Sequence, residues 1–208
     1  MKIHDISRPL SPATAPWPGD QHFELEWALR IEANQVVNLS SFRMSPHVGT
    51  HTDAPLHVVS GGGASESLAL EAYFGPARVL DVAVGSDLLI HPHCLDGVDI
   101  AAAPRILFRT GTDPDPTRFP ETFAAFAPST CRELAERGAV LVGIDTPSVD
   151  PADSKTLAAH HALLAGELHW IENLDLSRVG PGVYELAAFP LAIVGACASP
   201  VRAVLIER

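Results

Sequence analysis

Residues 47–57 read HVGTHTDAPLH and place three histidines and one aspartate within eleven positions. Imidazole nitrogens and carboxylate oxygens are the ligands that zinc or manganese takes when no thiolate is offered. Such an ion lowers the pKa of water and so supplies a nucleophile near neutral pH. A polar loop with surface histidines is the alternative, but few charged residues lie nearby to solvate it. The stretch therefore predicts a metal site, for which His47, His51, Asp53 and His57 are four potential ligands.

The backbone of this stretch is expected to be extended or looped. Gly49, two β-branched threonines and the flanking prolines all disfavour a helix. Residues at even spacing on a strand point to one side, so His51, Asp53 and His57 could share one face.

Composition limits the class of protein. The chain has 208 residues, 47% hydrophobic and 19% charged, which predicts one globular domain over residues 1–208. Its formal net charge is −11 and it has no cluster of basic residues, so we expect no binding to nucleic acid or anionic membranes.

The expected location is the cytoplasm. The first residues carry no apolar signal-peptide core, and no apolar run reaches transmembrane length. Cys94, Cys131 and Cys197 are widely spaced and form no CxxC pattern, which is typical of free thiols in a reducing compartment.

The hydrophobic pattern predicts a mixed α/β class with flanking helices. A hairpin formed by residues 23–31 and 36–44 would lead the chain to the metal motif. Ser129 is a candidate cap for one of the helices. Further strands are expected over residues 77–84, 105–110, 140–144, 183–188 and 201–207, and helices over residues 67–74, 129–137 and 156–165.

A second polar cluster could complete the metal site. Neighbouring residues on a helix lie about 100° apart, so at most one of His160 and His161 points inward easily, and the apolar pattern does not settle which. His169 and His161 are expected at the solvated surface. Glu167 and Glu172 are the carboxylates of this cluster and are further candidate ligands.

The motif H-x-G-T-H-x-D-x-P-x-H resembles the signature of the cyclase-type metal-dependent hydrolases. Within that group the chain resembles the bacterial kynurenine formamidases, or arylformamidases. The other matching stretches keep their order along the chain and are PWPGD (16–20), GIDTPS (143–148), SKT (154–156), HH (160–161) and IE (171–172).

The resemblance implies a swivelling β/β/α fold, a homodimer and two zinc ions per subunit, with manganese or another divalent ion as the alternative. The first ion would be held by His47, His51, Asp53 and Glu172. The second would be held by His160 together with Asp53 and Glu172, which bridge the two ions. His57 would be the proton donor and acceptor; its alternative role is that of another ligand.

Two other residues are candidates for the site. Trp17 lies between two prolines and could present a rigid surface to an aromatic substrate, as the resemblance also implies; the alternative is packing in the core or at a dimer interface. Asp145 follows an apolar strand and could either orient a liganding histidine or cap a turn.

The implied activity is hydrolysis of N-formyl-L-kynurenine to L-kynurenine and formate in tryptophan degradation. One alternative is a sibling of the same family that opens a different amide, such as isatin, with a single manganese. Another is a metal-binding protein without catalysis.

Overall fold

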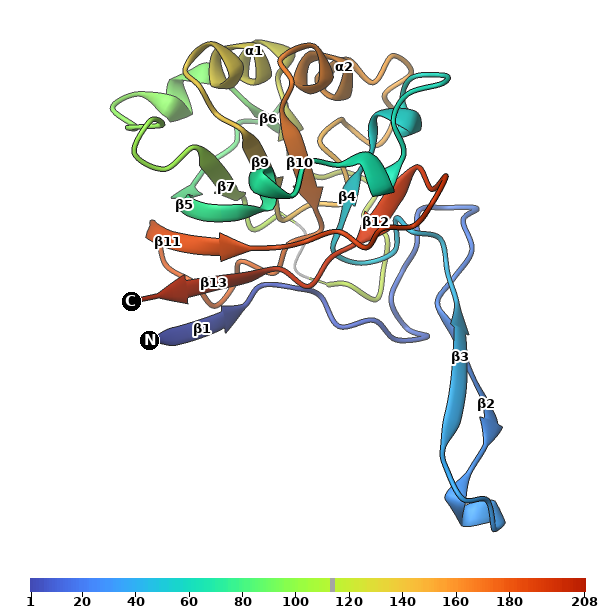
Figure 1. The fold of residues 1–208 in the computed structure, drawn as a ribbon. Helices are drawn as coiled ribbons and strands as arrows, with labels where there is room; N and C mark the ends of the chain where they lie inside the picture. The colour runs from blue at the N-terminus through green and yellow to red at the C-terminus, as the bar shows by residue number, and fades with distance from the viewer. Residues whose placement is uncertain (113–114) are drawn as a thin grey trace.

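A nine-stranded sheet forms the centre of the molecule in the computed structural model, which describes residues 1–112 and 115–208 (Figure 1). Its strands are β1 (Lys2–Asp5), β4 (His51–Asp53), β5 (Phe74–Asp81), β7 (Arg105–Arg109), β9 (Leu141–Ile144), β10 (His169–Glu172), β11 (Gly182–Ala187), β12 (Ala198–Pro200) and β13 (Val204–Glu207). Across the sheet they are ordered β1-β13-β11-β5-β7-β9-β10-β4-β12.

The middle of the sheet is parallel and its edges are antiparallel. Strands β5, β7, β9 and β10 run in one direction, and β4, β11, β12, β13 and β1 pair in antiparallel fashion on the two sides. All four residues of β9 are buried, as expected for a strand covered on both faces.

The two faces of the sheet bury different cores. Helices α1 (Pro128–Glu136) and α2 (Ala158–Ala165) cover one face, where Leu134 and Leu163 belong to one buried cluster with Ile106 and Val142 (Figure 1). The sheet curls so that β11 and β13 close the other face, and Leu107 packs there with their leucines. The predicted mixed α/β class is confirmed.

A hairpin of β2 (Glu24–Leu29) and β3 (Leu39–Arg43) projects away from the sheet (Figure 1). Its strands are shorter than predicted because the chain turns through a 3₁₀ segment, Ile31–Ala33, and Asn34 has a positive φ of 59°. A short parallel pair, β6 (Leu89–Ile90) and β8 (Ala125–Phe126), forms a separate two-stranded sheet.

The predicted helix over residues 67–74 is wrong. This region contains two 3₁₀ turns, Ser65–Ser67 and Leu70–Tyr73, because β5 already begins at Phe74 and leaves too few residues to nucleate an α-helix. Ser129 is not a cap either. The first helical residue is Pro128, whose missing N–H needs no partner at that position.

Other boundaries shift by a few residues. Strand β5 lies three residues earlier than predicted, and the predicted last strand, residues 201–207, begins only at Val204 as β13. The short strand β12 lies outside every predicted strand. In residues 1–112 and 115–208, no helix is both long enough and apolar enough to cross a bilayer.

Candidate metal centre

Strand β4 places His51 and Asp53 side by side on one face of the sheet. They are alternate residues, while Thr52 between them points to the opposite face and donates a hydrogen bond to the Trp170 carbonyl at 2.6 Å. His51 is opposite Glu172 in the antiparallel pairing of β4 with β10. Its Nε2 therefore lies 3.2 Å from Glu172 Oε2 and 3.4 Å from Asp53 Oδ1.

His47 reaches the same carboxylate from the turn before β4. Its Nδ1 lies 3.0 Å from Asp53 Oδ1. Gly49 has a φ of +71°, a conformation that a side chain would disfavour, and this lets the chain turn between the two histidines. The Gly49 carbonyl accepts a hydrogen bond from His51 Nδ1 at 2.9 Å, which orients the ring so that Nε2 faces the carboxylates.

His160 enters from helix α2 on the other side of the carboxylates. Its Nε2 lies 3.5 Å from Asp53 Oδ2 and 3.6 Å from Glu172 Oε1. Asp150 holds it there, because its Oδ2 accepts hydrogen bonds from His160 Nδ1 at 2.6 Å and from the His160 backbone N–H at 2.9 Å. Of the two adjacent histidines, His160 is therefore the one that points inward. It is buried, whereas His161 is exposed.

His57 faces the centre from its rim. The prediction that it shares a strand with His51 is wrong, because Pro55 ends β4 and begins a 3₁₀ turn, Pro55–His57. The turn nevertheless brings His57 Nε2 to 3.9 Å from Asp53 Oδ2. Its side chain remains 31% exposed, whereas those of His51 and His160 are buried, so His57 can reach both the centre and solvent.

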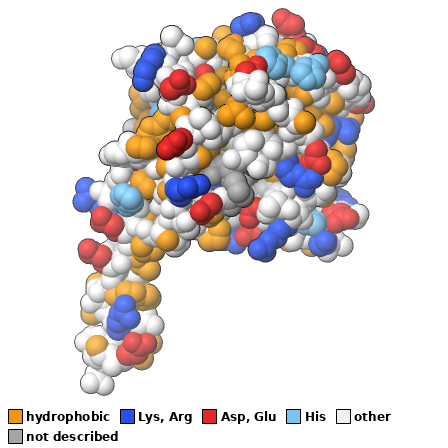
Figure 2. Space-filling model, turned by 180° about the vertical axis from the view of Figure 1, so that it is seen from behind, with side chains coloured by type: hydrophobic (Ala, Val, Ile, Leu, Met, Phe, Trp, Pro, Cys, Tyr) orange, Lys and Arg blue, Asp and Glu red, His pale blue; other side chains and the backbone are white. Residues whose placement is uncertain are grey.

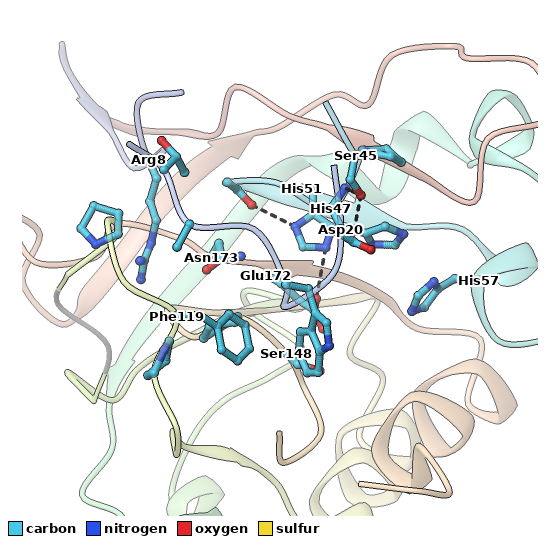
Figure 3. Close-up of a pocket in the computed structure, with 18 of the residues that line it drawn as sticks. Arg8, Asp20, Ser45, His47, His51, His57, Phe119, Ser148, Glu172 and Asn173 are labelled. Atoms are coloured by element: carbon cyan, nitrogen blue, oxygen red, sulfur yellow. Dashed lines mark hydrogen bonds and ion pairs between the residues drawn. The ribbon is translucent and has the colours of Figure 1, made fainter. Parts of the chain in front are cut away.

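These side chains line a pocket of about 480 Å³ (Figure 3). His57 lies at one side of it and Arg8 at the other, with Phe119 near its floor in this view. Trp17 also lines the pocket, and its indole packs edge-on against Phe119 with ring centroids 4.8 Å apart. The sequence-based placement of Trp17 in the pocket is therefore consistent with the geometry, and it brings a second aromatic ring with it.

The donor set fits a divalent cation. In the described part of the chain, His51 Nε2 and Asp53 Oδ1 are buried without a hydrogen-bond partner, although buried polar atoms are normally satisfied. The ligand atoms of His47, His51 and Asp53 lie within 4.8 Å of one another. An ion between them would satisfy both atoms at once.

Comparison with known proteins agrees with this geometry. The Cyclase family model matches residues 4–151. The chain belongs to the cyclase family. It is 50% identical to a kynurenine formamidase of Salinibacter ruber, covering 99% of this chain and 97% of the relative. It is 45% identical to a kynurenine formamidase of Bordetella pertussis, and the match covers 99% of this chain and 98% of that relative.

Solved structures share this fold. A protein described as a predicted metal-dependent hydrolase from Bacillus stearothermophilus superimposes with a TM-score of 0.84 at 28% identity, covering 100% of this chain and 98% of that one. Isatin hydrolase A from Ralstonia solanacearum gives a TM-score of 0.78 at 24% identity. The match covers 99% of this chain and 92% of that one and shows a common fold.

The histidines and carboxylates in the centre of this cyclase-family protein shift one another's pKa values. Burial favours neutral imidazoles, but the carboxylates of Asp53 and Glu172 outweigh it and raise the pKa of His51 to about 10. Burial is likewise outweighed at His160, where Asp150 and Asp53 raise the pKa to about 10. A cation that enters the centre must therefore displace protons from these rings.

The pKa values of Asp53 and His57 are both lowered, unlike those of His51 and His160. Burial opposes the charge of Asp53, but the imidazoles of His160, His47 and His51 beside its oxygens hold its pKa well below the usual range. Burial lowers the pKa of His57 and so favours its neutral imidazole. A neutral histidine beside the centre can accept a proton.

The other sequence-based candidates lie away from the cluster. Asp145 accepts hydrogen bonds from the backbone N–H groups of Thr110 and Gly111, so its interpretation as a turn cap is confirmed. Glu167 is exposed. The prediction of a solvated surface for His169 is wrong, because its Nδ1 lies 3.2 Å from the buried Tyr73 hydroxyl and its ring is half-buried.

Sequence reasoning missed three residues of the site. Asp150 gives no local signal because it caps α2 from outside the helix, and Trp170 donates to Asp53 Oδ2 at 3.1 Å from a neighbouring strand. Arg8 lines the pocket and donates to the Asp145 carbonyl at 2.7 Å. None of them belongs to the histidine motif, so only the folded chain brings them to it.

Proposed function

We propose that residues 1–208 form one metal-dependent hydrolase domain that converts N-formyl-L-kynurenine to L-kynurenine and formate. The observation that carries this proposal is the group of buried imidazoles and carboxylates at the base of a pocket with two aromatic rings. The rings suit an aryl group, and the small formyl group suits close approach to the base. The names of the relatives, which match over nearly their whole length, point to the same substrate.

The centre would hold two divalent ions, with zinc as the proposed metal. The carboxylate oxygens divide into two sets: Asp53 Oδ1 and Glu172 Oε2 face His51, whereas Asp53 Oδ2 and Glu172 Oε1 face His160. This division supports two bridging carboxylates. His47 and His51 would complete the first position and His160 the second. Bound ions would lower the pKa of water and polarise the formyl carbonyl.

His57 would move the proton that the reaction requires. Hydrolysis breaks the C–N bond, and the leaving nitrogen must gain a proton because an aryl amide anion leaves poorly. Burial favours the neutral form of His57, which is partly exposed and within 3.9 Å of Asp53 Oδ2. It would accept a proton from the attacking water and deliver it to the departing nitrogen, and Asp53 would stabilise its charged form.

The test is hydrolysis of N-formyl-L-kynurenine and of isatin by one preparation of known metal content. We expect turnover of the formamide, loss of activity after complete chelation, and recovery on addition of zinc. Preferential opening of isatin with a single bound manganese would favour the sibling enzyme. Bound metal without turnover of any aryl formamide would favour a binding protein, and full activity without metal would contradict the mechanism.

Replacement of Trp17 by alanine should raise KM more than it lowers kcat. The indole contacts Phe119 in the pocket, so its loss removes aromatic contact that would be equal in ground and transition states. Trp17→Phe is the control, because it keeps a ring at this position. An alanine variant that loses its metal or its fold would show that Trp17 mainly packs the structure.

A homodimer is proposed for the protein in solution. The β2–β3 hairpin stands clear of the body and carries exposed apolar side chains, among them Trp27, which is 44% exposed, and Phe42, which is 64% exposed (Figure 2). Such surfaces mark interaction sites, and a second copy would cover this one. The solution mass, measured by light scattering, tests the proposal.

A cytoplasmic location is also proposed. Cys94, Cys131 and Cys197 are all free, as expected in a reducing compartment.

A further inference from the structure

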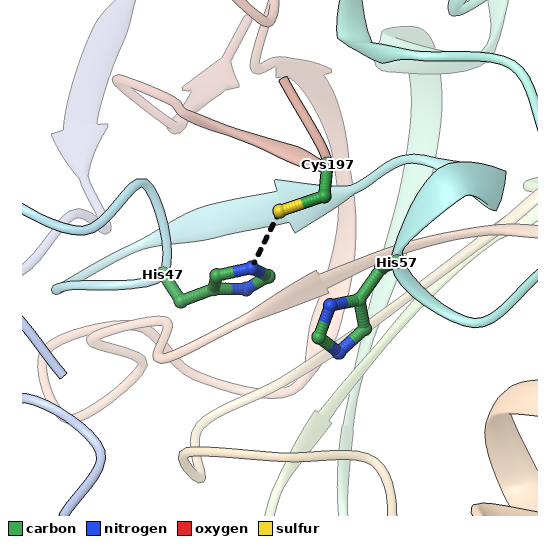
Figure 4. A group of neighbouring side chains, drawn as sticks. All are labelled: His47, His57 and Cys197. Carbon is green, nitrogen blue, oxygen red and sulfur yellow. Dashed lines mark hydrogen bonds between the residues drawn. The ribbon is translucent and has the colours of Figure 1, made fainter. Parts of the chain in front are cut away.

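Cys197 lies beside the metal centre, although it belongs to none of the predicted ligand sets. It immediately precedes β12, whose Ala198 is paired with Asp53 of β4. This register brings Cys197 to the pocket wall, where its carbonyl accepts a hydrogen bond from the Ala54 N–H at 2.9 Å. Its side chain is half-buried, and Sγ lies 3.3 Å from His47 Nε2 (Figure 4).

The His47 imidazole lies between Asp53 and Cys197. Its Nδ1 faces Asp53 Oδ1 at 3.0 Å, while its Nε2 faces the sulfur of Cys197. The His57 ring is also close, with its centroid 4.4 Å from that of His47. The potential ligand atoms of His47, His57 and Cys197 all lie within 4.8 Å of one another.

We propose that His47, His57 and Cys197 form an inhibitory site for a soft divalent cation, such as cadmium or excess zinc. Two imidazoles and a thiolate suit such ions, whereas the neighbouring centre offers imidazoles and hard carboxylates. On binding, the S–H bond of Cys197 would break, its proton would pass to solvent, and a sulfur–metal bond would form without any change of oxidation state. Solvent would fill the remaining position, because the site opens to the pocket.

Occupation of this site would stop the proposed reaction in two ways. The ion would take the lone pair of His57 and so remove the proton carrier. It would also compete for His47, since one imidazole binds two metals through both nitrogens only after losing both ring protons. The inhibitory effect rests on the proposed function, whereas metal binding by the three side chains does not.

The experiment is a titration of the zinc-loaded protein with cadmium, followed by both ultraviolet absorption and aryl-formamide hydrolysis. Cadmium bound to a thiolate gives a charge-transfer band that the sulfur-free centre cannot give. We expect one such band per chain and a fall in activity of about 10²-fold or more, because general acid–base help is lost.

Two variants identify the sulfur. Cys197→Ala should lose the band and need about 10-fold more cadmium or more for half-inhibition, since even outer ligand partners contribute that much to affinity. Cys197→Ser should behave in the same way. Because serine is close to cysteine in size, this variant keeps the test valid if the alanine variant misfolds. The matched control is Cys94→Ala, because Cys94 is also half-buried but lies outside the pocket, and it should behave like the wild type.

The outcomes separate this site from the proposed function. A wild-type protein without the band, or a Cys197→Ala variant as sensitive as the wild type, would overturn the site. A band that disappears with Cys94 instead would also overturn it. A protein that shows the Cys197-dependent band but never hydrolyses an aryl formamide would confirm the binding site and reject the proposed function.

Discussion

Replacement of Asp53 by alanine should empty the metal centre and lower the rate of hydrolysis by more than about 10³-fold, since a metal supplies several kcal/mol of transition-state stabilisation. The expectation rests on the position of this carboxylate. One oxygen lies 3.0 Å from His47 Nδ1 and 3.4 Å from His51 Nε2, and the other lies 3.5 Å from His160 Nε2. Its loss therefore removes a ligand from both proposed positions.

The measurement is metal content per chain together with the hydrolysis rate. Asp96→Ala is the control, because Asp96 is exposed and lies outside the pocket, and it should keep both. Circular dichroism would show whether the Asp53→Ala chain is folded. A folded variant with wild-type metal content and near-normal turnover would exclude Asp53 from the centre.

Replacement of His57 by alanine should leave the metals bound and lower turnover by about 10²–10⁴-fold, the usual contribution of general acid–base catalysis. His57 lies at the rim with its Nε2 3.9 Å from Asp53 Oδ2, farther from that residue than the other three histidines. Metal analysis distinguishes the two possible roles, because loss of a ligand would lower the metal content along with the rate.

The loss should also depend on the leaving group. A formanilide with electron-withdrawing groups on its ring needs less protonation at nitrogen, so the ratio of wild-type to His57→Ala rates should fall across a series of such substrates. A constant ratio would remove His57 from protonation of the leaving group. A drop in bound metal would place it among the ligands.

The sequence predicted the buried strands of the fold well and its short segments poorly. Strands β7 and β9 and helix α2 lie within two residues of their expected positions. The apolar runs of the two strands are buried in the sheet, and α2 packs one side against it through Ala159 and Leu163. The helix expected over residues 67–74 failed because pairing of Phe74 with Ala187 of β11 decides that segment. Pairing with a distant strand is invisible to local periodicity.

The sequence alone identified the candidate ligands within residues 47–57. Three histidines and an aspartate at these spacings, on a backbone that disfavours an α-helix, leave a metal site as the best interpretation of residues 47–57. The resemblance then selected His160 and Glu172, and the structure brings both to Asp53. Their roles as ligands stay predictions.

Only the tertiary structure decided how the centre is closed and oriented. Glu172 reaches His51 through the register of β10 on β4, and Asp150 selects His160 over His161 by binding its ring and its backbone N–H. Cys197 approaches His47 because β12 pairs with β4. The sequence specifies which donors exist, since ligand chemistry belongs to the side chain. Strand register and helix docking specify which donors meet, since those distances depend on contacts between segments more than a hundred residues apart.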